Sequence, residues 1–141
     1  MKRDLMNNIH PVVAIAPVVV TDGTVQKSAA IDVRNFRSVT FVIALGTLAD
    51  ADATWAVVVK EGSTSTQTAH TAVDDKNLVG TEALAGFTFA DDGETRKIGY
   101  VGDQDFVSIE IDDVVANAAA APMCCIMIAE PHNTPAPNPP L

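Results

Sequence analysis

Apolar and polar positions alternate with a period of two in several stretches of this sequence, which is typical of half-buried β-strands. The clearest stretch is Val107 to Asp112, where valine and isoleucine alternate with serine, glutamate and aspartate. Ahead of it, Ile98 and Tyr100 share one face. Between the two stretches, Gly102 to Asp105 supplies a glycine that tolerates positive φ and two Asp side chains that hydrogen-bond local backbone. The pattern predicts a β-hairpin over residues 96–111.

Two further runs, residues 38–45 and residues 123–129, are apolar on both faces. Strands with this pattern are buried on both sides, so the runs predict two central strands. The alternating run at residues 54–60 begins with Trp55, whose face is expected to pack across from Phe41.

The rest of the chain predicts short strands and irregular connections. Residues 12–20 form a strand candidate that Pro17 confines to a sheet edge, a bulge or two short pieces. The Ser/Thr-rich stretch at residues 63–72 predicts an exposed loop or edge, and residues 81–89 favour irregular chain over a helical turn. The segment at residues 112–121 is helix-friendly, with a long loop as the alternative. Shorter strands are predicted at residues 28–33 and 78–80, and turns at residues 21–24, 74–77 and 91–94.

Roughly seven to nine short strands with regularly spaced turns and no long helix predict an all-β domain, a β-sandwich or jelly roll. We expect this domain to span residues 12–130, after a polar N-terminal arm at residues 1–11. Residues 131–141 hold five prolines in eleven positions, which predicts an extended or polyproline-like tail. The 141-residue chain thus fits a single domain with an arm at each end.

Composition and charge narrow the class of protein. Hydrophobic residues make up 48% of the chain and charged residues 19%, as in globular proteins. Residues 1–70 carry six basic and six acidic residues, whereas residues 71–141 carry three and twelve, so the net charge of −9 belongs to the second half. A surface this acidic repels phosphate, and we expect no direct binding to nucleic acid.

Other signals argue against a membrane protein or a secreted one. The longest apolar run, at residues 12–20, is about half the length of a membrane span. The N-terminus has basic residues before an apolar run, but Asp4, His10 and two prolines fit a signal peptide poorly. Cys124 and Cys125 are adjacent, so in a strand they point to opposite faces and do not pair. We expect two buried thiols and folding in a reducing cytoplasm.

Candidate chemistry is sparse. The chain has no Gly-x-Ser-x-Gly elbow, and neither Cys stands in a recognisable catalytic context. His10, His70 and His132 lack metal-ligand spacing and are expected to be exposed. The turn with Asp103 and Asp105 is the best of several acidic pairs that could offer oxygen ligands to Ca²⁺, although none matches a known calcium loop. The other pairs are Asp50/Asp52, Asp74/Asp75, Asp91/Asp92 and Asp112/Asp113. We therefore expect no catalytic residue, no cofactor and no metal.

The order of these motifs resembles that of small virion proteins of tailed bacteriophages. The resemblance covers roughly residues 31–130 and is carried by Ile31 to Val33, Phe36, Ser38 to Val42, Glu61, Leu78 to Thr81, Lys97 to Gly102 and Phe106 to Ile109. In that pattern a basic residue often follows the second glycine, where this chain has Asp103 and Asp105. The resemblance suggests a capsid decoration or cement protein.

This resemblance implies a structural role without catalysis. A decoration protein binds the outside of an assembled shell, and its partner would be the major capsid protein. Such proteins commonly form homo-trimers at local three-fold positions of the shell, and the terminal arms would lie over adjacent subunits. The location implied is the capsid surface of the virion, after synthesis in the cytoplasm of the bacterial host.

Two other classes remain open. One is another virion part, a head-tail connector or a tail-tube subunit, which would form rings or tubes. The other is a carbohydrate-binding β-sandwich, whose usual signature is exposed aromatic side chains. With Trp55, Tyr100 and five Phe, mostly at positions expected in the core, that signature is weak. An enzyme is the least supported class.

Overall fold

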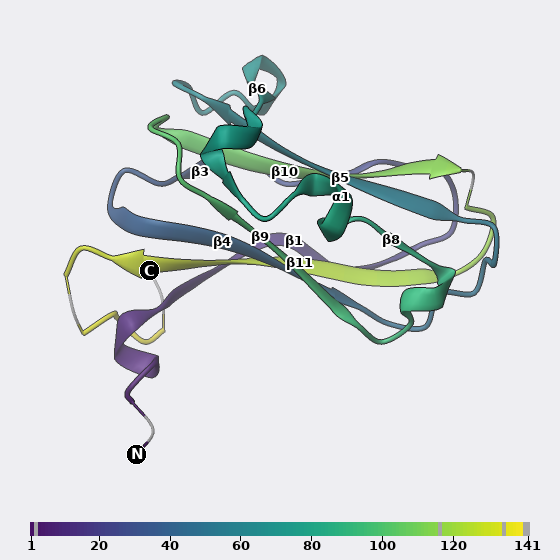
Figure 1. Cartoon of the computed structure of the whole chain (residues 1–141), viewed down its shortest axis with the longest axis horizontal. Helices are drawn as coiled ribbons and strands as arrows, with labels where there is room; N and C mark the ends of the chain where they lie inside the picture. The colour runs from purple at the N-terminus through teal and green to yellow at the C-terminus, as the bar shows by residue number, and fades with distance from the viewer. Residues whose placement is uncertain (2, 116, 134, 140–141) are drawn as a thin grey trace.

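Two antiparallel β-sheets lie face to face in the computed structural model, which describes residues 1, 3–115, 117–133 and 135–139 (Figure 1). The two layers enclose one hydrophobic cluster. The fold is therefore a β-sandwich, which confirms the predicted all-β class. None of the helices in the described part of the chain has the length and apolar composition needed to cross a membrane.

Sheet A has five strands and forms the lower layer in Figure 1. In spatial order they are β1 (His10–Val20), β11 (Ala121–Pro131), β4 (Phe36–Leu45), β9 (Thr95–Tyr100) and β7 (Leu78–Val79). Sheet B forms the upper layer, in the order β2 (Gln26–Lys27), β10 (Phe106–Val115), β5 (Thr54–Gly62) and β6 (Thr71–Ala72). Two short strands complete it, since β3 (Ile31–Asp32) pairs with β10 and β8 (Phe87–Thr88) pairs with β5. The helical turns are η1 (Met6–Asn8), η2 (Gln67–Ala69), η3 (Asp75–Asn77), α1 (Glu82–Ala85) and η4 (Phe89–Asp91).

The two runs that are apolar on both faces are central strands, as predicted. β4 lies between β11 and β9, and β11 lies between β1 and β4. Phe41 from sheet A and Trp55 from sheet B are both almost completely buried in the shared core. Trp55 also stacks on Phe87, with ring centroids 5.9 Å apart. Burial of side chains this large contributes about 1.5–3 kcal/mol each to folding.

The predicted hairpin over residues 96–111 is wrong. β9 pairs with β4 and β7 in sheet A, whereas β10 pairs with β5 in sheet B. The connection between them therefore crosses from one sheet to the other. Tyr100 fixes this crossing, because its hydroxyl donates to Glu61 Oε2 at 2.6 Å and accepts from the Gln104 amide at 3.0 Å. Alternation identifies each stretch as a strand, but it does not say which strand is the partner.

Helical structure also differs from the prediction. Residues 112–115 continue β10 instead of starting a helix. The short helix lies at α1, within the segment expected to be irregular, and the Thr81 side chain caps it by accepting from the Leu84 amide at 3.2 Å. Because α1 has only four residues, packing against β5 and β9 decides its formation, and sequence periodicity gives little warning of it.

Both ends of the chain lie at the same end of the sandwich (Figure 1). β1 is the edge strand of sheet A, and its register shifts on either side of Ile15, which agrees with the edge or bulge that Pro17 predicts. Beyond β11, the backbone amide of Ala136 donates to the Asn7 carbonyl at 2.8 Å. The described part of the proline-rich segment therefore returns to the residues that precede β1.

Candidate interaction surface

The outward side of sheet A is built mainly from apolar side chains. In β11, Ile126 points away from the core, and its register partners are Val13 of β1 and Val42 of β4. Val13 is 62% exposed and Ile126 is 38% exposed. We call this surface the apolar face, and define it by Pro11, Val13, Val19, Thr40, Val42, Ala44, Lys97, Pro122, Cys124, Ile126 and Ile128.

Negative charge is largely absent from this surface. An antiparallel sheet with one solvated face normally carries polar residues there. Strand propensity accounts for valine and isoleucine at such positions, but it does not explain a lack of carboxylates in a chain of net charge −9. Of the chain's 18 acidic residues, only Glu130 lies in the strands of sheet A, which also contain Arg37, Arg96 and Lys97. The acidic character of the protein therefore belongs to sheet B and to the connecting segments.

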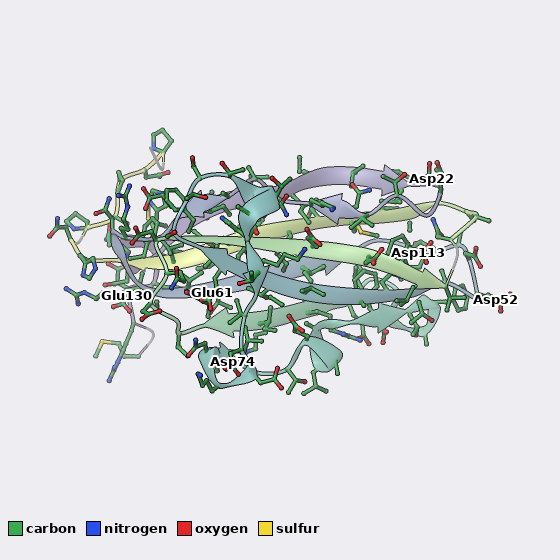
Figure 2. The ribbon with its side chains drawn as sticks, turned by 90° about the horizontal axis from the view of Figure 1, so that it is seen from above. Asp22, Asp52, Glu61, Asp74, Asp113 and Glu130 are labelled. Atoms are coloured by element: carbon green, nitrogen blue, oxygen red, sulfur yellow. The ribbon has the colours of Figure 1, made fainter. Side chains whose placement is uncertain are left out.

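The outward side of sheet B carries a cluster of paired charges around Glu110. Figure 2 looks onto this sheet from above, and among its labelled carboxylates Glu61 belongs to β5 and Asp113 to β10. On β10, Glu110 lies 2.8 Å from Lys60 Nζ and 3.6 Å from Lys27 Nζ, and it accepts from Gln67 Nε2 at 2.7 Å. Burial acts to raise the pKa of Glu110, but the bonds to Lys60 and Gln67 and the charge of Lys27 lower it overall. This face has the satisfied polar chemistry of a surface that remains in water.

Histidine burial differs from the prediction that all three histidines are exposed. His70 is 7% exposed, with Nδ1 2.9 Å from Ser108 Oγ and Nε2 2.9 Å from the Thr64 carbonyl oxygen. Because a carbonyl only accepts, Nε2 carries the proton, and in the neutral ring Nδ1 accepts from Ser108. His10 is also buried and packs on Phe36, with ring centroids 5.1 Å apart. His70 lies in a Ser/Thr-rich stretch and His10 at the start of β1, and only the tertiary fold shows that both are enclosed.

Ser108 and His70 resemble a nucleophile and its base in distance alone. Ser108 is completely buried, so a substrate has no access to its hydroxyl. The pair instead fastens the segment between β5 and β6 onto β10. We assign it a structural role.

The edges of sheet A are poor sites for adding a partner strand. The long free edge is β1, where Pro11 and Pro17 lack amide hydrogens and the register shifts twice. Prolines and bulges of this kind protect an edge against pairing with another chain. The opposite edge of sheet A, β7, has only two residues. The apolar face itself is therefore the more suitable surface for an interaction.

A groove lies where the apolar face meets β7 and α1. It has a volume of 650 Å³, and its apolar lining includes Val79, Leu84 and Val101. These three side chains are exposed by 60%, 75% and 59%. Lys97 and Arg96 also line the groove. The groove combines aliphatic walls with basic groups.

The acidic pairs do not form a metal site among the residues that the structure describes, where no three His, Cys, Asp or Glu side chains converge. Asp103 and Asp105 lie in the connection from sheet A to sheet B. Others of these carboxylates hold local structure instead. Asp91 lies 2.5 Å from Arg96, Asp92 accepts from the Leu48 amide, and Asp74 lies 2.8 Å from Lys76. Asp50 accepts from the amides of Asp52 and Ala118, and Asp113 accepts from the Asn117 amide.

The cysteines and aromatic residues agree only in part with expectation. Cys125 is buried, and burial raises the pKa of its thiol to about 12. Cys124 is half-buried on the apolar face, so only one of the two thiols is fully enclosed.

Among the described aromatic side chains, Phe89 is the only one classed as exposed, at 41%. A flat aromatic platform for sugar binding is therefore lacking in the described part of the chain.

The apolar face was missed at the level of sequence, although the signal was present. Apolar residues on both sides of residues 38–45 and 123–129 indicate central strands, and the natural inference is that both sides are covered. The structure covers only one side. These runs contain no acidic residues. In so acidic a chain, that was the one sequence signal that their second side is an exposed apolar surface.

No family model matches the sequence, and no curated protein matches it. Several solved structures have a distant likeness to the fold. A protein of Bacillus endospore appendages, described as disulfide-linked pili, is 14% identical over 94% of this chain and 98% of its own, with a TM-score of 0.40. A family 35 carbohydrate-binding module from Clostridium thermocellum is 9% identical over 84% of this chain and 96% of its own, with a TM-score of 0.43. A PRD1 vertex protein is 7% identical over 90% of this chain and 99% of its own, with a TM-score of 0.48. Likenesses this distant identify neither a family nor a ligand.

Proposed function

We propose that this protein is a structural virion protein that binds the outside of a tailed-phage capsid and stabilises it. The observation that carries the proposal is the apolar face, an open sheet surface with almost no carboxylates on a protein of net charge −9. The resemblance of residues 31–130 to small virion proteins supports the same role. The partner is the major capsid protein, and the role involves no catalytic step.

The segregation of charge gives the bound protein an orientation. The apolar face lies on the shell, where burial of apolar area contributes about 25 cal/mol per Å². The acidic side of sheet B then faces solvent, where its charge discourages aggregation of decorated particles. Association as a homo-trimer at local three-fold positions would place three apolar faces across the boundaries between shell subunits, so that binding holds neighbouring subunits together.

Sedimentation with purified phage heads tests the proposal. Wild-type protein is expected to sediment with the heads in a copy number on the scale of the shell subunits. A copy number that fits a single ring would instead indicate a head-tail connector, and binding to a glycan array without binding to heads would indicate a carbohydrate-binding module. Either of these results contradicts decoration.

A pair of matched variants tests whether the apolar face is the surface that attaches to the head. Val13→Asp places a charge on the apolar face, and Val114→Asp places one at a comparably exposed position of sheet B, since these residues are 62% and 59% exposed. We expect Val13→Asp to lose binding to heads, because burial of an unpaired carboxylate is costly, and Val114→Asp to bind like wild type. Equal binding of both variants would exclude the apolar face as the attachment surface.

Cys124 gives an independent readout of orientation, because its half-buried thiol lies on the apolar face. A maleimide should label Cys124 in the free protein and label it more slowly when the protein is bound to heads. Unchanged labelling in the bound state would show that another surface faces the shell.

A further inference from the structure

The groove between the apolar face, β7 and α1 has the shape and the chemistry of a specific pocket, in contrast to the flat sheet beside it. Its 650 Å³ is within the range of sites that enclose a compact ligand group. Val79 and Leu84 provide its aliphatic walls, and both are more exposed than most apolar side chains of this protein. Gly99 lies at the base, where an added Cβ would come within 3.0 Å of the Val79 Cβ, so the lack of a side chain allows β7 to lie close.

The charges around the groove are not balanced. Arg96 is already paired, with Asp91 at 2.5 Å and Glu94 at 2.6 Å. Lys97 is exposed and forms no ion pair with any residue that the structure describes. Its register partner is Val42, and the strands of sheet A contain a single carboxylate, Glu130. The groove therefore offers one unpaired ammonium group beside an aliphatic pocket.

We infer that this groove binds an extended aliphatic segment of a partner protein that carries an acidic side chain, with the carboxylate on Lys97 and the aliphatic group between Val79, Leu84 and Val101. The inference rests on the proposed function, and it specifies the chemistry of the capsid segment that would be recognised. A second copy of this chain is a poorer occupant, because its sheet A brings another Lys97 and only Glu130 as a counter-charge.

Short peptides test this pocket without any capsid. The probes are acetyl-Val-Leu-Val-Asp-amide and its Asn counterpart, titrated into the full-length, ¹⁵N- and methyl-labelled protein and followed by NMR. We expect the Asp peptide to shift the resonances of Val79, Leu84 and Val101, and the Asn peptide to bind about two- to fivefold more weakly, as for loss of one exposed ion pair.

Variants identify the contributions of the two kinds of contact. Lys97→Met keeps an apolar stem but removes the charge, and it should abolish the preference for Asp over Asn. Leu84→Ser should weaken both peptides about fivefold or more, by loss of apolar contact. Val114→Ser, at an exposed valine of sheet B, is the matched control and should bind like wild type.

Three results would overturn the inference: equal affinity for the two peptides, shifts confined to other surfaces, or no binding. Concentration-dependent shifts of the same resonances without peptide would also overturn it, in favour of a second copy as the occupant. These failures are distinct from failure of the proposed function, because Val13 lies outside the groove lining and head binding can persist when the peptides do not bind.

Discussion

Gly62 and His70 form a contact whose energy can be measured by a double-mutant cycle. A Cβ added to Gly62 would lie 2.6 Å from His70 Cδ2, which is closer than real side chains approach, and 3.2 Å from Nε2. The ring cannot move away freely, because it is 7% exposed and both of its nitrogens are hydrogen-bonded at 2.9 Å. The backbone φ of Gly62 is not in the left-handed region, so the expected effect of Gly62→Ala is steric.

The expected free energies follow from these contacts. Gly62→Ala should overpack the site and displace His70, at a cost of about 1–3 kcal/mol. His70→Ala should also destabilise the protein, since it leaves the buried Ser108 hydroxyl without a partner at a cost of about 1–3 kcal/mol. Once the ring is removed, the new methyl group has space, and Gly62→Ala should be neutral or stabilising by about 0.4–1 kcal/mol. The coupling energy between the two positions is therefore about 1–3 kcal/mol or slightly more.

Urea unfolding measures the free energy of unfolding of the wild type, of each single variant and of the double variant. The single tryptophan, Trp55, is 2% exposed and reports unfolding through its fluorescence. Gly46→Ala is the control, because its Cβ would clash with the Pro122 Cβ at 2.8 Å and not with His70. It should therefore lower the free energy of unfolding by the same amount in the wild-type and His70→Ala backgrounds. The steric explanation is wrong if Gly62→Ala is equally destabilising in both backgrounds.

Three further predictions concern titrating groups. Burial, and then the hydrogen bond to Glu61, raise the pKa of Tyr100, so the free energy of unfolding should fall above about pH 10, by up to about 1.4 kcal/mol per pH unit. The raised pKa of Cys125 adds a similar slope, so Tyr100→Phe should make the fall shallower by about 1.4 kcal/mol per pH unit without abolishing it, as measured by urea unfolding at a series of pH values. An unchanged slope would assign the whole effect to other groups. The pKa of Glu110 is lowered, so its contribution to stability is present above the unfolded pKa of about 4.3 and is lost as the pH falls further. Lys60→Met should reduce this acid dependence, with Lys97→Met, which removes a charge that forms no ion pair with any described residue, as the control. At pH 8 iodoacetamide should modify Cys124 and spare Cys125, whose pKa is raised to about 12 by burial; labelling of a Cys124→Ser variant, detected by mass spectrometry, would contradict this.

Strand identity could be predicted from sequence, because it depends on local alternation. Residues 38–45, 54–60 and 123–129 are strands, and each buries one of its two faces. Strand pairing could not be predicted in the same way. The stretch at residues 96–111 has every local feature of a hairpin, yet its two strands lie in different sheets. That outcome depends on pairing with β4 and β5, strands that lie far from residues 96–111 in the sequence.

The amino-acid sequence alone determined the all-β class, the central strands and the acidity of the second half, since each depends on residue type and local period. Only the tertiary structure decided that His70 is buried, and that the apolar positions of β1, β4 and β11 lie side by side on one uncovered face. The physical reason is that side-chain alternation assigns each residue to one of two sides of its strand, whereas sheet register and layer packing decide which of those sides is covered.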